Sequence, residues 1–236
     1  MEVRLNRYLA MCGVASRRAA DKLIASGECC VNGRVVTRMG CCVNNDSDTV
    51  TVGGRIIRLP VKKTYLMLNK PRGYITSAKD QFGRPIVMDL IKSDERLFPV
   101  GRLDCDTSGL LIVTDDGELS YRLTHPKHGV VKTYIAEITG RPTDQSAERF
   151  RRGLDIGGYT TAPADFEIIG KNQFNTKVMI KISEGKNRQV KIMCECIGHP
   201  VVSLHRTAIG ELRLSDVKTG EYRELTDAET AYLSGL

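Results

Sequence analysis

The feature that most constrains this chain is a short polar loop that runs directly into an apolar segment. Residues 101–109 read Gly-Arg-Leu-Asp-Cys-Asp-Thr-Ser-Gly, and residues 110–113 read Leu-Leu-Ile-Val. The apolar run predicts a strand buried on both faces, and the small polar residues before it predict a tight turn. Reactive groups are commonly presented on loops that a rigid scaffold positions. Asp104 is therefore the first candidate for a reactive side chain.

The length and hydropathy of the chain indicate one large domain, or a small domain joined to a larger one. The chain has 236 residues. Its apolar runs fall well short of the roughly 20 residues that a membrane-spanning helix needs. The N-terminus leads into an amphipathic segment and lacks the apolar core of a signal peptide. We therefore expect a cytoplasmic protein.

The net charge of +7 favours an anionic partner. Residues 1–60 carry nine Lys and Arg against five Asp and Glu, a local excess of +4. Lysine and arginine gain affinity for RNA or DNA by releasing condensed counterions, so a nucleic acid is the leading partner class. A solvated basic surface is the alternative that charge alone leaves open.

The eight cysteines include the adjacent pairs Cys29-Cys30 and Cys41-Cys42. A protein without an export signal is expected to keep its thiols reduced and buried. Neighbours on a strand point to opposite faces and do not readily ligate one ion, and no Cys-x-x-Cys spacing is present. We expect no metal site.

The first fifty residues predict a small module of two helices and a hairpin sheet. Helical spacing covers residues 4–11 and 16–26, with Ser16 placed to cap the second helix. Asn32-Gly33 between apolar residues is a strong hairpin signal, and a further strand is expected at 49–52. This pattern resembles the alpha-L RNA-binding module of a small-subunit ribosomal protein. The candidates for phosphate contact are Arg4, Arg7, Arg17, Arg18 and Lys22.

A linker is expected at residues 59–63, which separates domains at 1–60 and 61–236. Beyond it, strands are predicted at 64–68, 110–114, 133–139, 166–169, 176–182 and 201–209. Helices are predicted at 117–123, 143–152, 187–197 and 226–233, the last with a Thr226-x-x-Glu229 capping box. Strands outnumber helices and do not alternate strictly with them, so the fold class is α+β with a mixed, largely antiparallel sheet.

Asp104 and Asp106 form an Asp-x-Asp pair that two chemistries use. In a magnesium-dependent phosphatase of the haloacid-dehalogenase type, the first aspartate attacks phosphorus and the second acts as acid and base. That family places the pair directly after an apolar strand, whereas here the apolar run follows the pair. The order of the segments disfavours the phosphatase.

The loop and its flanking segments resemble the RsuA-type ribosomal RNA pseudouridine synthases, including the RluB branch. The corresponding segments are Gly101–Leu111, Leu68–Tyr74, Gly83–Leu90, His125–His128 with Lys132–Tyr134, and Glu184–Met193. They stand in the family's order between about Lys63 and Arg206. The resemblance implies an isomerase that flips a uridine out of ribosomal RNA, breaks its C1′–N1 bond and rejoins the base at C5. It implies no cofactor.

The resemblance also implies roles for single residues. Asp104 initiates the reaction, by attack on the sugar, attack on the base or removal of a ribose proton. Tyr134 stacks on the uracil and is expected to take the proton from C5, and Lys191 supplies a cation that keeps Asp104 ionised. Substrate contacts are expected from Arg102, Leu204, Lys70 and Arg72, with Leu204 equally interpretable as a core residue.

The target and the assembly are less constrained by the sequence. The segment 14–18, Val-Ala-Ser-Arg-Arg, favours a large-subunit target slightly over a small-subunit one. The substrate is expected to be ribosomal RNA, either free or within a ribosomal assembly intermediate, and the protein is expected to be a monomer. The main alternative is a non-catalytic RNA-binding or ribosome-assembly protein that retains a synthase-like body.

Overall fold

A computed structural model describes residues 2–236, which divide into two compact units. The first unit comprises the described residues up to Thr64, together with Ser93–Leu97 and Asp115–Gly117. The second unit comprises Tyr65–Lys92, Phe98–Thr114 and Glu118–Leu236. No helix among residues 2–236 is long and apolar enough to cross a membrane.

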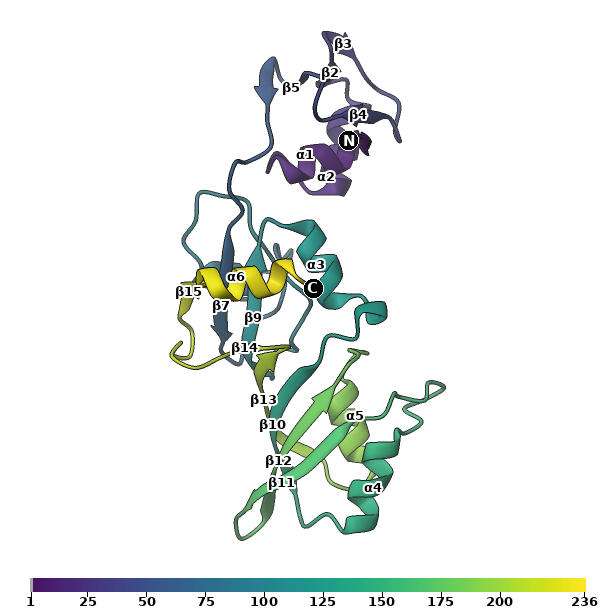
Figure 1. The fold of residues 1–236 in the computed structure, drawn as a ribbon, viewed down its shortest axis with the longest axis vertical. Helices are drawn as coiled ribbons and strands as arrows, with labels where there is room; N and C mark the ends of the chain where they lie inside the picture. Colours follow the sequence, from purple (N-terminus) through teal and green to yellow (C-terminus); the bar gives the residue numbers. More distant parts are fainter. Residues whose placement is uncertain (1) are drawn as a thin grey trace. The chain divides into compact units, whose positions relative to one another are not determined.

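The N-terminal unit packs two helices against small sheets (Figure 1). Its elements are β1 (Glu2–Arg4), α1 (Leu5–Met11), α2 (Arg17–Ala25), β2 (Cys29–Val31), β3 (Arg34–Val35), β4 (Cys42–Asn44), β5 (Val50–Val52) and β6 (Arg55–Ile57). The two sheets have the strand orders β1-β4 and β3-β2-β5-β6. Both helices bury their apolar faces in one core that includes Leu5, Leu9 and Ile24.

The local signals that predicted this unit are present. The Ser16 hydroxyl accepts a hydrogen bond from the Ala19 N–H at the start of α2, as a helix cap does. Asn32 and Gly33 both have positive φ, at 51° and 77°, which is the backbone of a two-residue hairpin turn between β2 and β3. The predicted helix, hairpin and strand 49–52 are therefore confirmed in this unit.

The larger unit is built on one mixed sheet. Its path runs β11 (Asp165–Lys171), β12 (Asn175–Ile182), β10 (Lys132–Thr139), β13 (Val201–Ile209), β9 (Ser108–Thr114), β7 (Tyr65–Lys70) and β15 (Tyr222–Glu224). Short strands β8 (Phe98–Pro99) and β14 (Leu212–Arg213) pair with β9 and β13. Every pairing is antiparallel except the one between β13 and β9. The prediction of an α+β fold with a largely antiparallel sheet is confirmed.

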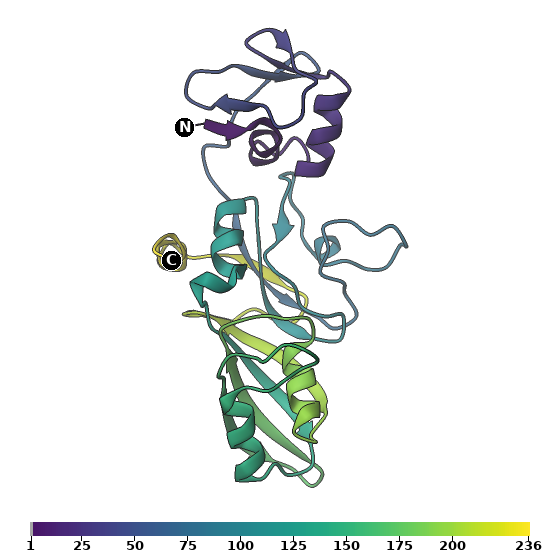
Figure 2. The ribbon, with the colours of Figure 1, turned by 90° about the vertical axis from the view of Figure 1, so that its right-hand side faces the viewer.

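Helices cover both faces of this sheet (Figures 1 and 2). The helices are α3 (Gly117–Thr124), α4 (Asp144–Arg152), α5 (Gln189–Cys196) and α6 (Asp227–Ser234), with short 3-10 turns η1 (Val87–Leu90) and η2 (Pro126–His128). One core packs α4 and α5 on the sheet, and a second packs α3 and α6. The Thr226 capping box at the start of α6 is present.

Strand β9 shows why its sequence is continuously apolar. Leu110 and Ile112 belong to the core under α3 and α6, whereas Leu111 belongs to the core under α4 and α5. Successive side chains of a strand point to opposite faces, so a strand covered on both faces has no polar position. Residues 110–113 are all fully buried, as predicted. The strand is a rigid support for the polar loop that precedes it.

Gly109 at the start of β9 is required by a close backbone approach. Its φ is +111°, and a Cβ at this position would lie 2.2 Å from the carbonyl oxygen of Arg206 on β13. This is the point at which β9 and β13 pair in parallel. A side chain here would push the two strands apart, next to the loop that carries Asp104.

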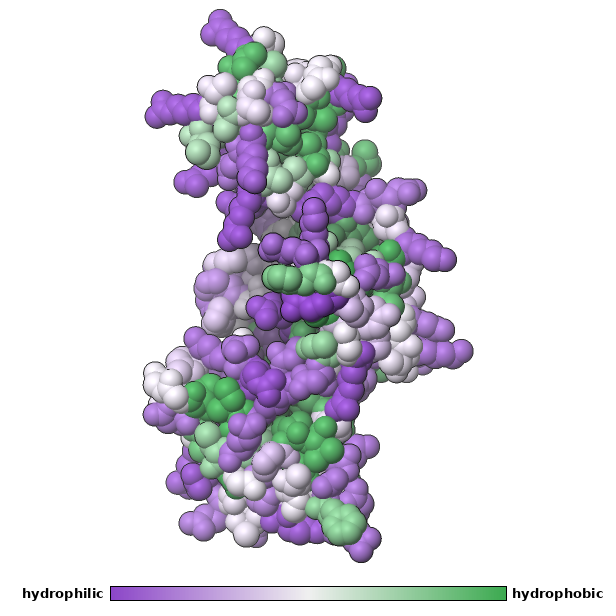
Figure 3. Space-filling view, turned by 180° about the vertical axis from the view of Figure 1, so that it is seen from behind, coloured by the Kyte–Doolittle hydropathy of each residue, from purple (hydrophilic) through white to green (hydrophobic). Residues whose placement is uncertain are grey.

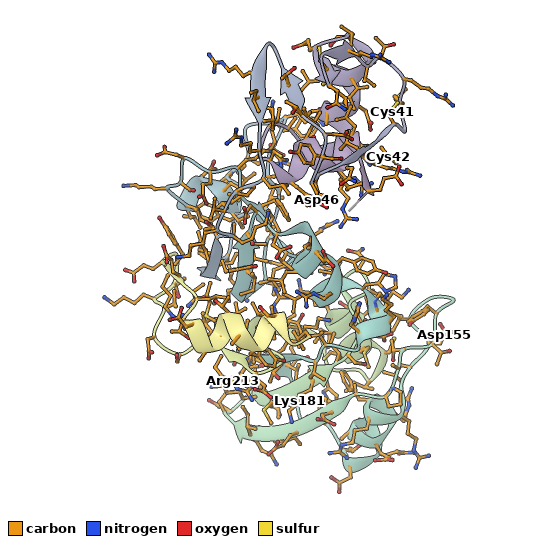
Figure 4. All side chains as sticks on the ribbon, turned by 45° about the horizontal axis from the view of Figure 1, so that its top comes forward. Cys41, Cys42, Asp46, Asp155, Lys181 and Arg213 are labelled. Atoms are coloured by element: carbon orange, nitrogen blue, oxygen red, sulfur yellow. The ribbon has the colours of Figure 1, made fainter. Side chains whose placement is uncertain are left out.

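The sequence did not predict several short strands, and the expectation that all cysteines are buried was wrong for three of them. β1, β6, β8, β14 and β15 have two or three residues each, too few to display a period of two. All eight cysteines are free thiols. The expectation that they are buried is wrong for Cys42, Cys105 and Cys196, which are exposed; Cys42 lies in the N-terminal unit (Figure 4).

The surface is mainly hydrophilic. On the face drawn in Figure 3, polar and charged side chains predominate, and apolar residues form separate small patches. Scattered apolar residues are normal on soluble proteins. An exposed aromatic residue therefore needs a further structural reason before it is given a role.

Candidate active site

The loop that carries Asp104 is held from beneath by the amine of Lys70. Lys70 is the last residue of β7, and its side chain is fully buried. Its Nζ donates to the carbonyl oxygens of Asp104 at 3.0 Å and Thr107 at 2.8 Å, and also to that of Pro71 at 3.0 Å. Because the loop's own carbonyls converge on one ammonium group, the backbone around Asp104 has a defined shape.

The prediction that Lys70 contacts the substrate is wrong. Its amine is enclosed by backbone oxygens and has no exposed surface to offer to RNA. Burial lowers the pKa of Lys70 to about 8, although the charges of Cys105, Asp106 and Asp104 act in the opposite direction. Lys70 is a positioning residue for the loop.

Asp104 and Asp106 share one cation, Lys191 of α5. The Lys191 Nζ lies 2.8 Å from Oδ2 of Asp104 and 2.5 Å from Oδ1 of Asp106. Lys191 is only 5% exposed, so its amine is buried against the two carboxylates and is not solvated at the surface. Burial alone would raise the pKa of Asp106, but the hydrogen bond and charge of Lys191 outweigh it and lower that pKa.

This ion pair bears on the phosphatase alternative. A phosphatase of that class needs the Asp-x-Asp carboxylates to face a magnesium ion. Here the ammonium of Lys191 lies between the two carboxylates. The chain thus provides its own cation at the position where that chemistry would need a metal.

Asp104 opens into a cavity of about 160 Å³ in the larger unit. Sequence-predicted residues from four separate segments line it, namely Arg102, Asp104, Tyr134, Lys191 and Leu204. Two of these segments meet because β10 and β13 are neighbours in the sheet, where Ala136 pairs with Leu204 and Tyr134 pairs with Arg206. The fold therefore gathers the reactive carboxylate, an aromatic ring and an apolar wall at one hollow.

Tyr134 and Leu204 belong both to the cavity wall and to the core. Tyr134 is 8% exposed and Leu204 is 5% exposed, and both contact the core under α4 and α5. The two interpretations left open for Leu204 are therefore compatible, because one side of the residue packs inward while the cavity lies on the other. A wall fixed by core packing gives the cavity a stable width.

The cavity also has cationic residues that were not singled out from the sequence, among them Lys132 and Arg206. Lys132 precedes Tyr134 by two positions on β10, and Arg206 follows Leu204 by two on β13. Burial, with a smaller contribution from the charge of Arg206, lowers the pKa of Lys132 to about 8. The Arg206 Nε donates to the Leu110 carbonyl at 2.8 Å. The period of two along each strand was the signal that could have identified both.

Arg72 and Arg102 line a second hollow beside the same loop. The Nη2 atom of Arg72 donates to the Val202 carbonyl at 3.1 Å, and Arg102 is exposed and borders both hollows. Arg84 and Arg188 also line the second hollow, and Arg188 lies 3.9 Å from Asp106. Several guanidinium groups thus surround the outer side of the Asp104 loop.

The N-terminal end of α5, which carries Lys191, is braced by a buried carboxylate. Glu184 accepts hydrogen bonds from the Gln189 amide at 2.6 Å, the Tyr159 hydroxyl at 2.5 Å and the Ala162 N–H at 3.0 Å. Gln189 in turn accepts from the Lys186 N–H at 2.9 Å. These contacts fix the start of α5, and hence the position from which the Lys191 side chain reaches Asp104.

The predicted RNA contacts of the N-terminal unit are all exposed. They are Arg4 and Arg7 at the start of α1, and Arg17, Arg18 and Lys22 on α2. The two helices are joined by a hydrogen bond of 2.9 Å from Asn6 to Asp21. The unit therefore presents several cations from a fixed helical pair.

Comparison with known protein families identifies both parts of the chain. The family described as RNA pseudouridylate synthase matches residues 64–196, which is more than half of the chain. This chain belongs to the RNA pseudouridylate synthase family. An S4 domain matches residues 3–40, and the resemblance predicted from the sequence motifs is confirmed for both segments.

Relatives extend the match over the full length. The ribosomal large subunit pseudouridine synthase B of Bacillus subtilis (strain 168) is 42% identical, over 99% of this chain and 96% of the relative. The ribosomal small subunit pseudouridine synthase A of Vibrio cholerae (serotype O1, strain El Tor Inaba N16961) is 37% identical, over 97% and 98%. A crystal structure of a pseudouridylate synthase, 33% identical, aligns over 98% of this chain and 99% of its own with a TM-score of 0.70. The prediction of an RNA pseudouridine synthase, an isomerase, is therefore confirmed.

Proposed function

We propose that this synthase isomerises a specific uridine of ribosomal RNA, using Asp104, Tyr134 and Lys191 as its catalytic residues. The observation that carries the proposal is the carboxylate of Asp104 at a cavity, 2.8 Å from the buried amine of Lys191 and beside the ring of Tyr134. The reaction breaks C1′–N1, turns the uracil and forms C1′–C5, and it releases the hydrogen of C5. Atoms balance without a redox carrier or metal, so we propose that no cofactor takes part.

Each residue has a role that its surroundings support. Lys191 places its ammonium 2.8 Å from Oδ2 of Asp104, so it orients the carboxylate and supplies a positive charge next to the reacting group. Tyr134 offers a flat ring on which the extruded base stacks, and its hydroxyl oxygen takes the proton from C5 while the hydroxyl's own proton passes to solvent. Leu204 forms the apolar wall of the uracil pocket, and Arg102 and Arg72 contact the RNA backbone at the cavity rim.

We propose a large-subunit ribosomal RNA as the target. The relative named for the large subunit is 42% identical, and the one named for the small subunit is 37% identical. The exposed cations Arg4, Arg7, Arg17, Arg18 and Lys22 contact phosphates of the same RNA, in a domain spanning 1–60, while 61–236 forms the catalytic domain. The proposed setting is a cytoplasmic monomer acting on free or partly assembled ribosomal RNA.

Nucleotide-resolution mapping of pseudouridine tests this proposal. Unmodified transcripts of both ribosomal RNAs are incubated with the wild-type protein, with Asp104→Asn and with Asp165→Asn. Asp165 is the matched control, because its exposed carboxylate pairs with Lys181 at 3.4 Å and neither residue lines either hollow. We expect one modified uridine in the large-subunit RNA with the wild type and Asp165→Asn, and none with Asp104→Asn.

The pattern of failure separates the remaining alternatives. Modification of the small-subunit RNA would leave the chemistry intact and overturn the choice of target. Equal modification by Asp104→Asn would remove Asp104 from the mechanism. Binding of either RNA without any modification, in naked or ribosome-assembled form, would point to the RNA-binding assembly factor instead.

A further inference from the structure

The larger unit carries a phenylalanine whose side chain is mostly exposed to solvent. Phe82 is 76% exposed and lies in the loop between β7 and η1, which projects away from the sheet in Figure 2. Exposure alone would not distinguish it, since Phe174 at the turn between β11 and β12 is 72% exposed. What distinguishes Phe82 is that a guanidinium lies against its ring and that its loop is hydrogen-bonded to the segment that carries Asp104.

The carboxylate of Asp80 holds the turn that presents Phe82. It accepts hydrogen bonds from the backbone N–H groups of Phe82 and Arg84, both at 2.9 Å, and it pairs with the Arg84 guanidinium at 2.7 Å. Hydrogen bonds from Arg84 lower the pKa of Asp80 to about 2, so this bonding persists at any working pH. The loop therefore does not depend on a partner to adopt its shape.

The guanidinium of Arg84 lies against the Phe82 ring. Its central carbon is 5.0 Å from the ring centroid, within the range of a cation–π contact. Gly83 between them has a φ of +68°, a left-handed conformation that turns the chain back and brings the two side chains together. A flat apolar ring and a cation are thus displayed side by side.

The loop is fastened directly to the segment that carries Asp104. At its base, Ile75 and Ile86 form a bridge, with hydrogen bonds of 2.9 Å from the Ile75 N–H to Pro85 and 3.0 Å from the Val87 N–H to Ile75. The hydroxyl of Thr76 donates to the Leu103 carbonyl at 2.7 Å and accepts from the Leu103 N–H at 3.1 Å, both buried. Since Leu103 directly precedes Asp104, the position of Phe82 is set relative to the reactive carboxylate.

Arg84 links the loop to the hollow beside Asp104. It lines that hollow together with Arg102, Arg188 and the residues 103–106. The exposed ring therefore stands next to a basic surface that adjoins the reactive group. This combination of an aromatic face with nearby guanidinium groups is how proteins hold single-stranded or unstacked bases.

We propose that Phe82 and Arg84 form a stacking platform for a base that neighbours the flipped uridine. Extruding a uridine from a helix leaves adjacent bases without a stacking partner, and a ring held at a fixed position replaces that partner. Arg84 at the same time pairs with a backbone phosphate or shares the stack. The inference rests on the proposed action on a uridine in folded RNA.

The platform is tested with two RNA hairpins that carry the uridine mapped for the wild type. In one hairpin the uridine is base-paired, and in the other it is left unpaired opposite a deleted nucleotide. The variants are Phe82→Ala, Phe82→Trp and the matched control Phe174→Ala, an equally exposed aromatic residue that lines neither hollow. Tritium release from uridine C5 gives kcat/KM, and 2-aminopurine beside the uridine reports stacking by fluorescence.

We expect Phe82→Ala to lower kcat/KM about tenfold on the paired hairpin, a change typical of losing one base–aromatic stack. The loss should be smaller on the unpaired hairpin, and Phe82→Trp should restore both the rate and the fluorescence change. Phe174→Ala should match the wild type. A Phe82→Ala rate and fluorescence equal to wild type on both hairpins would overturn the platform.

The two readouts separate this inference from the proposed function. A wild type that isomerises neither hairpin would count against the proposed activity, and the fluorescence would still decide the platform. A fluorescence change on binding that depends on Phe82 supports the platform, whereas one that is the same in Phe82→Ala overturns it.

Discussion

Two buried lysines approach the Asp104 loop from opposite regions of the catalytic unit, and they meet different partners. Lys70, at the end of β7, donates to backbone carbonyls of the loop. Lys191, on α5, donates to the carboxylates of Asp104 and Asp106. Removing Lys70 should alter the shape of the loop, whereas removing Lys191 should alter its charge. We therefore expect the same residue type to serve loop stability in one region and catalysis in the other.

The largest expected effect is on the rate of Lys191→Met. Without the ammonium, Asp104 and Asp106 lose the cation that they share, and with it the contact that orients the Asp104 carboxylate. We expect isomerisation to fall about 100-fold or more, as for loss of a group that controls a catalytic acid or base. Single-turnover rates check this. The melting temperature should move little, because the apolar chain of methionine fills the buried path of the lysine; a rate near wild type would contradict the assignment.

The second-largest effect is expected for Lys70→Met, on the free energy of unfolding. Methionine matches the volume but leaves buried carbonyl oxygens of the loop without a donor. Each unsatisfied buried polar group costs about 1–3 kcal/mol, so we expect the free energy of unfolding to drop by about 2–4 kcal/mol. Urea denaturation measures it. If Lys70→Met were as stable as the wild type, the loop would not depend on this amine for its shape.

A third lysine, Lys132, extends the comparison, because its partial burial should make the free energy of unfolding depend on pH. Among residues 2–236, no carboxylate lies within ion-pair distance of Lys132, whose pKa falls to about 8 on folding from an unfolded value near 10.4. Between these values the unfolded chain binds the extra proton, so stability rises with pH. Because the amine is only half-buried, we expect the wild type to gain roughly 1 kcal/mol over Lys132→Met between pH 7.5 and 9.5. Urea denaturation of both proteins at both pH values measures this gain. The same difference in unfolding free energy at pH 7.5 and pH 9.5 would mean that Lys132 does not titrate in this range.

The smallest effect is expected for Arg188→Gln. Arg188 lies 3.9 Å from Asp106, and both side chains are largely exposed. Exposed ion pairs contribute about 0–1 kcal/mol, so stability should stay within that range and the rate within about threefold. Thermal melting and the tritium assay check both. A loss comparable to that of Lys191→Met would mean that the outer cation, and not the buried one, controls the carboxylates.

The sequence allowed the reactive loop to be predicted because its pattern is local. An acid between glycines, followed by a run of four apolar residues, specifies a turn and a doubly covered strand without knowledge of the rest of the fold. Lys191 was also identified, through the resemblance of residues 184–193 to the family's motif.

Lys70 was misjudged because its environment is not local. A lysine before proline and arginine has the composition of a basic surface, and only the fold brings the carbonyls of residues 104 and 107 around its amine. The strand β15 was missed for a similar reason, since its three residues have meaning only through pairing with β7. Lys132 was also missed, but it shares a strand face with Tyr134, so the period of two would have been sufficient to identify it.

The central claim is that the carboxylate of Asp104 drives the exchange of a C–N bond for a C–C bond at uridine. The most direct measurement is tritium release, in single turnover and with EDTA present, from ribosomal RNA labelled at uridine C5, comparing the wild type with Asp104→Asn. Joining the sugar to C5 must expel that hydrogen. We predict complete release by the wild type at its target uridine and none by Asp104→Asn. Release at the same rate by both proteins, or by neither, would contradict the account.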